Sequence, residues 1–211
     1  MPVRADLKRL GRVWSWPAIL LLASVIAGCT VSAGRDFARP SDGSLAIGST
    51  TESQVMSQYG QPLSTGTEDK NGVTVNKLIY TYSSNEEALV GGITPVRSLA
   101  FFFVDRVLVG YEFVSSYPAD HTSFDETKRS MITKGVSTEA DVRALLGRPN
   151  GEFGPPFVEQ PTVRALVYSY QQVQVEIGFF SGEMHHGTKR LFIELDADGI
   201  VRDYKFESAT T

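Results

Sequence analysis

One short motif occurs twice in this chain and constrains its architecture more than any other feature. The first copy runs from Gly48 to Pro62 and the second from Gly135 to Pro149. Both copies have a leading glycine, a Thr-Glu pair, a valine and a closing Gly-x-Pro at matching positions. In the second copy, Ser137 or Thr138 can cap a helix N-terminus, and glycine followed by proline ends a helix. The motif therefore predicts one short helix in each half of a duplicated chain.

Strand-like segments follow each predicted helix. Period-two alternation and β-branched or aromatic residues predict strands over 73–82, 98–104 and 107–114 in the first half, and over 164–170, 173–180, 190–195 and 200–206 in the second. Identical residues occur at corresponding positions of the two halves, for example Tyr80 and Tyr168, or Leu99 and Leu191. The duplication thus extends beyond the helices into the strands.

These patterns predict an α+β fold of two tandem repeats. Each repeat is expected to pack one or two short helices on a three- to four-stranded antiparallel sheet, and to leave the other face of the sheet free for a partner. The repeats span 45–116 and 121–208. A leading helix in the second repeat would begin at a capping box at Ser123 and place Phe124, Met131 and Ile132 on one face. Phe37 and Leu45 fall opposite Phe124 and Ile132 in the first repeat.

An export signal is predicted over residues 1–28. A basic start precedes an apolar run that is interrupted by Pro17 and is shorter than the roughly 20 apolar residues of a spanning helix. The run ends in Ile-Ala-Gly followed by Cys29, the only cysteine in the chain. This ending resembles the lipobox of bacterial lipoproteins, in which the cysteine thiol takes a diacylglyceryl group. An uncleaved signal anchor is the alternative.

Lipidation at Cys29 would attach the protein to a bilayer and leave the rest of the chain soluble. Residues 29–44 then form a lipidated N-terminus and a tether, in which Phe37 is the one large apolar residue. In lipoproteins, an aspartate after the cysteine signals retention in the inner membrane. Thr30 in that position favours the periplasmic face of the outer membrane.

Charge and cysteine content exclude several classes of function. The chain has 24 acidic and 20 basic residues and a net charge of −4, and the basic signal leaves the mature part more negative, which argues against nucleic acid as a partner. Without a cysteine after Cys29, disulfides, thiol catalysis and cysteine-containing metal sites are excluded. No nucleophile elbow or phosphate-binding glycine loop is present. We therefore expect no catalytic residues and no cofactor, with a hydrolytic or metal-dependent enzyme as the third alternative.

A histidine pair is the one candidate for metal binding. His185 and His186 lie between two predicted strands near Glu183, and two imidazoles with a carboxylate could ligate a metal. Adjacent residues of an extended segment point to opposite sides, however. Solvated histidines are therefore preferred, and no metal site is predicted.

A loop after the second motif is the candidate partner-binding site. It carries Phe153, Pro155, Pro156 and Phe157, two aromatic residues on a stiff Pro-Pro frame. Exposed aromatic residues in a rigid loop lose little entropy on binding. The alternative is that Phe153 or Phe157 tucks back under the sheet.

The stretch from Lys134 to Pro149, followed by strands and preceded by a lipobox, resembles the signature of the SmpA/OmlA family, which includes the outer-membrane assembly factor BamE. A duplicated unit of the same kind also underlies the architecture of β-lactamase inhibitor proteins. The resemblance implies a lipid-anchored periplasmic module that binds envelope or outer-membrane proteins and supports envelope integrity or outer-membrane protein assembly. The alternative function is inhibition of an envelope enzyme such as a β-lactamase or a protease.

Overall fold

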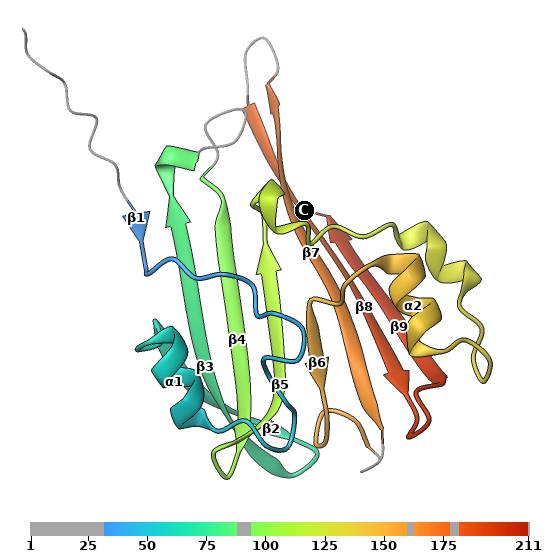
Figure 1. The fold of residues 1–211 in the computed structure, drawn as a ribbon. Helices are drawn as coiled ribbons and strands as arrows, with labels where there is room; N and C mark the ends of the chain where they lie inside the picture. The colour runs from blue at the N-terminus through green and yellow to red at the C-terminus, as the bar shows by residue number, and fades with distance from the viewer. Residues whose placement is uncertain (1–31, 88–93, 160–162, 178–181, 211) are drawn as a thin grey trace, which may run out of the picture.

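A single antiparallel sheet dominates the molecule. The computed structural model describes residues 32–87, 94–159, 163–177 and 182–210, without the side chains of 87, 172–186 and 210. Within these residues, nine strands form one sheet in the order β1-β3-β4-β5-β6-β7-β8-β9, with β2 paired to β3 (Figure 1). The strands are β1 (Ser32–Ala33), β2 (Ser64–Lys70), β3 (Val73–Ser84), β4 (Val96–Val104), β5 (Val107–Ser115), β6 (Gly151–Phe153), β7 (Arg164–Ile177), β8 (Gly182–Leu195) and β9 (Val201–Thr210).

Short helices complete the described fold. The two α-helices are α1 (Glu52–Tyr59) and α2 (Glu139–Leu146), and the 3-10 segments are η1 (Asn85–Glu87), η2 (Pro118–Asp120) and η3 (Glu126–Met131). In Figure 1, α1 lies beside β3 and β4 and α2 beside β8 and β9. We name the side of the sheet on which these helices pack the helix face, and the opposite side the open face.

The prediction of two α+β repeats, each with its own small sheet, is wrong. Strand is the most frequent secondary structure of the described chain, and the sheet runs without a break from one half to the other. The strand that joins the halves is β6, which pairs with β5 through Glu112 and Gly151 and with β7 through Gly151 and Val167. Three residues are too few to give a period-two signal. The sequence therefore indicated a loop at the place where the sheet becomes continuous.

The two motif helices have the same local structure. Thr51 and Thr138 are the N-caps, and each forms a capping box with the residue three positions later. Gly60 and Gly147 end the helices at positive φ angles of 82° and 81°, a conformation that glycine adopts without a Cβ clash. The predicted starts and stops of both helices are confirmed.

Each helix also meets the sheet through the same backbone contacts. The Glu52 N–H donates to the Arg106 carbonyl, and the Glu139 N–H donates to the Gly199 carbonyl. Isolated bridges join Thr51 to Val107 and Thr138 to Ile200. The hairpin turn after β4 and the turn after β8 therefore hold equivalent helix N-termini.

Loss of the second cap should measurably weaken the fold. We expect Thr138→Ala to lower the free energy of unfolding by about 1 kcal/mol, because the Asp141 N–H loses its acceptor. Thr138→Ser keeps the hydroxyl oxygen and should retain most of that stability. Urea unfolding followed by circular dichroism measures both. Equal stability of the alanine and serine variants would show that the cap contributes nothing.

Apolar side chains from each half build a separate core on the helix face. The first core contains Leu45, Val55, Tyr59, Leu78, Tyr80, Leu99, Phe101, Phe103, Leu108 and Phe113. The second contains Phe124, Ile132, Val142, Leu146, Leu166, Tyr168, Leu191, Ile193, Leu195 and Val201. Most residues of the first core have a counterpart in the second at the offset that the sequence repeat predicts.

Met131, expected to point inward with Phe124, is instead 62% exposed. The reason is that η3 is a 3-10 segment, whose side chains do not follow the α-helical period.

A tyrosine in each core ties the end of a helix to the sheet. The Tyr80 hydroxyl donates to the Gly60 carbonyl at 2.9 Å, and the Tyr168 hydroxyl donates to the Gly147 carbonyl at 3.0 Å. These carbonyls follow the last helical turn, where backbone acceptors lack partners inside the helix. Burial raises the pKa of Tyr80 and of Tyr168. Both hydroxyls therefore stay neutral donors.

The tyrosine cores should make the fold sensitive to alkali. Burial, with smaller contributions from Tyr111 and Tyr80, raises the pKa of Tyr59 from 10.0 to about 12. A group whose pKa is higher in the folded state contributes stability that is complete below the unfolded pKa and is lost as the pH rises through the folded pKa. We expect the free energy of unfolding to fall between pH 10 and about 12, and to fall less steeply in Tyr59→Phe. Parallel pH profiles of the two proteins would contradict this expectation.

Residues 32–44, where a tether is expected, are mostly exposed but contact the sheet at several points. β1 pairs with β3, and the Phe37 ring contacts Tyr59, Tyr80 and Phe113 with centroids 6.3 to 6.5 Å apart. The Arg39 guanidinium donates to the carbonyls that follow α2, those of Arg148 and Pro149, at 3.0 and 2.8 Å. This N-terminal segment therefore crosses from the first half to the second.

Strand boundaries differ from prediction in two further places. The segment predicted at 164–170 and the described part of the one predicted at 173–180, residues 173–177, belong to one strand, β7, which pairs with β8 along its whole length. β2 was not predicted, because its sequence Ser-Thr-Gly-Thr-Glu-Asp-Lys lacks apolar alternation. As an edge strand it pairs on one side and buries little surface, so a polar strand is tolerated.

Candidate functional site

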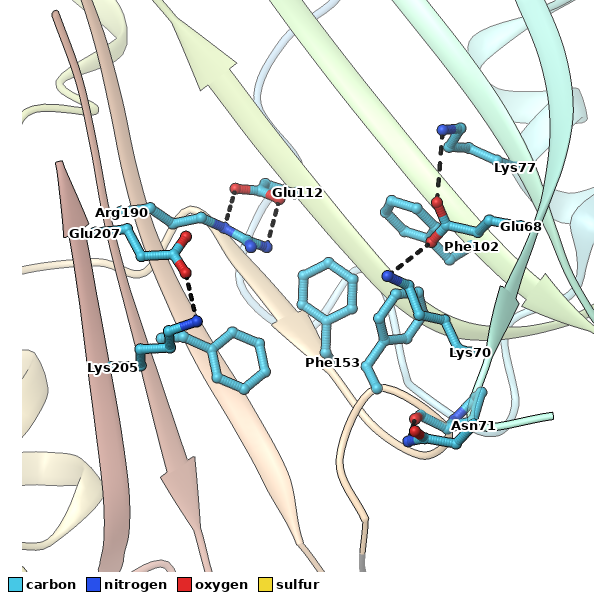
Figure 2. Close-up of a pocket in the computed structure, with 13 residues that line it drawn as sticks. Glu68, Lys70, Asn71, Lys77, Phe102, Glu112, Phe153, Arg190, Lys205 and Glu207 are labelled. Atoms are coloured by element: carbon cyan, nitrogen blue, oxygen red, sulfur yellow. Dashed lines mark hydrogen bonds and ion pairs between the residues drawn. The ribbon is translucent and has the colours of Figure 1, made fainter. Parts of the chain in front are cut away.

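The open face contains a hollow of about 480 Å³ over the junction of the two halves (Figure 2). Ligand sites in proteins commonly fall between about 300 and 1,000 Å³. Strands from both halves line it: β2, β3, β4 and β5 from the first, and β6, β8 and β9 from the second, with the loop after β6. Its lining residues are Glu68, Lys70, Asn71, Lys77, Phe102, Glu112, Phe153, Pro156, Phe157, Arg190, Phe192, Lys205 and Glu207.

Four phenylalanine rings form an aromatic floor in this hollow, and we use that name for Phe102, Phe153, Phe157 and Phe192. The Phe153 ring lies 5.3 Å from Phe102, 4.6 Å from Phe157 and 6.1 Å from Phe192, measured between centroids. Phe102 in β4 and Phe192 in β8 alternate with residues of the helix-face cores, so they point to the open face. Phe153 in β6 and Phe157 in the loop after it pack against them there. The floor is therefore a consequence of strands that are apolar on both faces.

A glycine makes room for the central ring of the floor. Gly110 pairs with Phe153 across β5 and β6. A Cβ at Gly110 would lie 2.3 Å from a ring carbon of Phe153, far inside van der Waals contact. Glycine at this position therefore leaves the space that the Phe153 ring occupies.

One wall of the hollow is an ion pair between the two halves. Arg190 on β8 donates to both carboxylate oxygens of Glu112 on β5, at 3.1 and 2.9 Å, and Figure 2 shows the pair side by side. Ser169 on β7 also donates to Glu112. A bidentate pair of this kind fixes geometry as well as charge. The Glu112 carboxylate therefore accepts hydrogen bonds from two strands of the second half, β7 and β8.

The opposite wall is built by the β2–β3 hairpin. Lys70 and Lys77 lie 3.8 and 3.7 Å from the two carboxylate oxygens of Glu68. The Asn71 side chain donates to the Pro156 carbonyl at 2.8 Å, which fixes the loop after β6 against the hairpin. The hairpin and the loop thus close one end of the hollow.

Exposed charges on β9 complete the rim. Lys205 and Glu207 form an ion pair at 2.7 Å, and hydrogen bonding to Lys205 lowers the pKa of Glu207. A second hollow of about 360 Å³ shares Glu112, Arg190 and Glu207 with the first and continues along β7, β8 and β9. Together the two hollows form an elongated groove on the open face.

The predicted partner-binding loop lies at this groove, but its residues play different parts. Phe153 is 1% exposed, so the alternative that it tucks against the sheet is correct for this residue. Phe157 and Pro156 line the hollow and are half-buried, whereas Pro155 is exposed. The loop therefore offers Pro156 and Phe157, and not Phe153, to a partner.

The other predicted site residues are not brought to the groove. Cys29 lies outside the described residues. His185 and His186 lie in β8, opposite Gln174 and Val173, and their side chains are outside the description. No group of three or more His, Cys, Asp or Glu side chains that could hold a metal occurs among the described residues. In the same part of the chain, no helix is long and apolar enough to cross a membrane.

Sequence reasoning missed the charged walls of the groove. Lys70, Lys77, Glu112 and Arg190 are scattered over 121 positions and belong to no motif. Glu112 and Arg190 alternate with core residues in their strands, which could have assigned them to the open face. Their pairing could not have been found, because it depends on the register across β6.

Comparison with known proteins gives little further information. No family model matches the chain, and no curated protein matches it. Among solved structures, a candidate beta-lactamase inhibitor protein from Streptococcus mutans is similar, with 11% sequence identity and a TM-score of 0.40 over 75% of this chain and 82% of that chain. A match at this level leaves the resemblance to the SmpA/OmlA family a prediction.

Proposed function

We propose that this chain is a lipid-anchored periplasmic module of the outer membrane that binds an envelope protein through the groove on its open face. The observation that carries the proposal is the aromatic floor, which lies in a hollow between walls of paired charges. An apolar centre with a polar rim is the usual anatomy of a protein-binding surface. Within the described residues, the helices pack on the other face, so the groove is left open.

The anchor and the family are part of the same proposal and rest on the sequence. The lipobox at Cys29 supports attachment to a membrane, and Thr30 supports the outer membrane. The motif from Lys134 to Pro149 supports membership of the SmpA/OmlA family. The proposed action is contact and not catalysis, because the three carboxylates that line the hollow, those of Glu68, Glu112 and Glu207, each lie in an ion pair with a lysine or arginine.

Site-specific photocrosslinking tests the proposal in native envelopes. A benzoylphenylalanine replaces Val114, which lines the second hollow, in the full chain. The matched control places it at Val136, which is 69% exposed and precedes α2. We expect a discrete protein adduct from position 114 and none of the same size from position 136. No adduct at 114, or the same adducts at both positions, would count against the proposal.

A titration separates binding from inhibition. Soluble protein is added to purified envelope β-lactamases and proteases. We expect their activity to be unchanged. A stoichiometric loss of activity would assign the groove to an inhibitor instead of an assembly or integrity module.

A further inference from the structure

The charge of the first hollow is opposite in sign to that of the chain. Its lining contains four cationic residues, Lys70, Lys77, Arg190 and Lys205, and three anionic residues, Glu68, Glu112 and Glu207. The whole chain carries a net charge of −4. A local excess of positive charge in an acidic protein attracts anionic groups to that place.

The excess is located on the β2–β3 wall. Arg190 and Lys205 each have a carboxylate of their own, at 2.9 and 2.7 Å. Lys70 and Lys77, by contrast, share Glu68, and both ammonium groups lie 3.7 Å or more from it. These distances are longer than a direct hydrogen bond. Two ammonium groups therefore have donor capacity to offer to a second carboxylate.

The same wall borders the aromatic floor. The Lys70 ammonium lies 5.5 Å from the centroid of the Phe157 ring, and Phe157 contacts Phe102 with centroids 5.0 Å apart. A ligand carboxylate held by the lysines would be followed at once by an apolar surface. The site is therefore complementary to a ligand in which an acidic residue stands next to an apolar residue.

The groove favours a chain over a compact ligand. The second hollow extends it past Glu112 and Arg190 along β7 to β9, so the binding surface is long and open. An extended peptide segment can place successive side chains along such a surface.

We infer that the groove binds an extended acidic segment of the partner protein, with a carboxylate between Lys70 and Lys77 and a neighbouring apolar side chain on Phe102 and Phe157. This inference rests on the proposed function and specifies the chemistry of its partner. In the free protein, Glu68 is the carboxylate that pairs with both lysines. It therefore competes with the partner carboxylate for the two ammonium groups.

Substitutions that remove either the cations or the carboxylate of the β2–β3 wall should change peptide affinity in opposite directions, and they test this inference. The probe is a fluorescein-labelled peptide with the core Phe-Glu-Leu-Glu, and its counterpart carries lysine in place of glutamate. Binding to the full chain in detergent is measured by fluorescence anisotropy. We expect the acidic peptide to bind roughly tenfold more tightly than the basic one, and added salt to weaken it. The double variant Lys70→Gln, Lys77→Gln should lose about tenfold in affinity.

Glu68→Gln gives the sharper result, because removal of the competitor should tighten binding roughly threefold. Lys134→Gln removes a cation next to Tyr204, away from the groove, and should leave affinity unchanged. Equal binding of the two peptides, or no gain in Glu68→Gln, would overturn the inference. Absence of peptide binding with a discrete adduct at position 114 would overturn the inference alone, whereas absence of both would also remove the proposed function.

Discussion

Replacing Phe153 with alanine is expected to lower the free energy of unfolding by about 3 to 5 kcal/mol. The side chain is 1% exposed and contacts three other rings, those of Phe102, Phe157 and Phe192. Its removal leaves a cavity that rigid β-strands on both sides cannot close. Arg190 also loses a ring beneath its guanidinium, which lies 5.9 Å from the Phe153 centroid. Urea unfolding followed by circular dichroism measures the loss.

Two alanine variants calibrate this result. Phe157→Ala removes a half-buried ring from the same floor and should cost about 1 to 2 kcal/mol. Leu63→Ala removes a side chain that is 66% exposed and should change stability by no more than about 0.5 kcal/mol. If Phe153→Ala is no more destabilising than Phe157→Ala, the floor is not the packed cluster that we describe.

The comparison of these two phenylalanines also separates fold from function. Both rings line the hollow, but Phe153 is 1% exposed and supports the floor from within, whereas Phe157 is half-buried and can contact a partner. Phe157→Ala should therefore reduce partner binding in a protein that is still folded. Loss of binding in Phe153→Ala alone would be attributable to unfolding.

The sequence predicted the elements that its own residues specify locally. Both motif helices begin at a threonine cap and end at a glycine, because capping depends on residues within one helical turn. The predicted strands 98–104 and 107–114 leave only Asp105 and Arg106 between them, and both residues adopt the positive φ angles of a tight hairpin turn, 48° and 66°. Such signals do not depend on the rest of the chain.

The arrangement of these elements depends on contacts that the sequence does not show. β6 joins the halves with three residues, and Asn150 just before it donates from its backbone to Val167 and from its side chain to Phe113. Nothing in the spacing of the repeats indicates which edge of one sheet meets which edge of the other. For this reason the sequence predicted a small sheet in each repeat without predicting how the repeats are arranged, whereas the structure has one continuous sheet.

The same limit applies to the candidate site. The loop from Phe153 to Phe157 stood out because Pro and Phe are adjacent in the sequence. The charged walls come from residues distant in sequence, such as Lys77 and Arg190, that the continuous sheet brings to one face. A groove at a junction of repeats is therefore visible only once the register across the junction is known.

Gly151→Ala tests that junction and should destabilise the protein by about 3 kcal/mol. A Cβ at Gly151 would lie 2.2 Å from the Tyr111 carbonyl oxygen and 2.9 Å from the Glu112 Cα. Both are backbone atoms of β5 and cannot move without breaking the pairing of Gly151 with Glu112. The variant must therefore either separate β5 from β6 or strain both, and the Glu112–Arg190 pair, which spans the junction, should loosen with it.

Gly66→Ala is the matched control, because the same change in edge strand β2 meets no atom within 4 Å. Alanine is favoured over glycine in a strand by roughly 0.5 to 1 kcal/mol, so this variant should be as stable as the parent or slightly more so. The same substitution is thus expected to lower the free energy of unfolding at Gly151 and to leave it unchanged or raise it slightly at Gly66. If both variants unfold at the same urea concentration as the parent, β6 does not pair closely with β5, and the halves are not joined into one sheet.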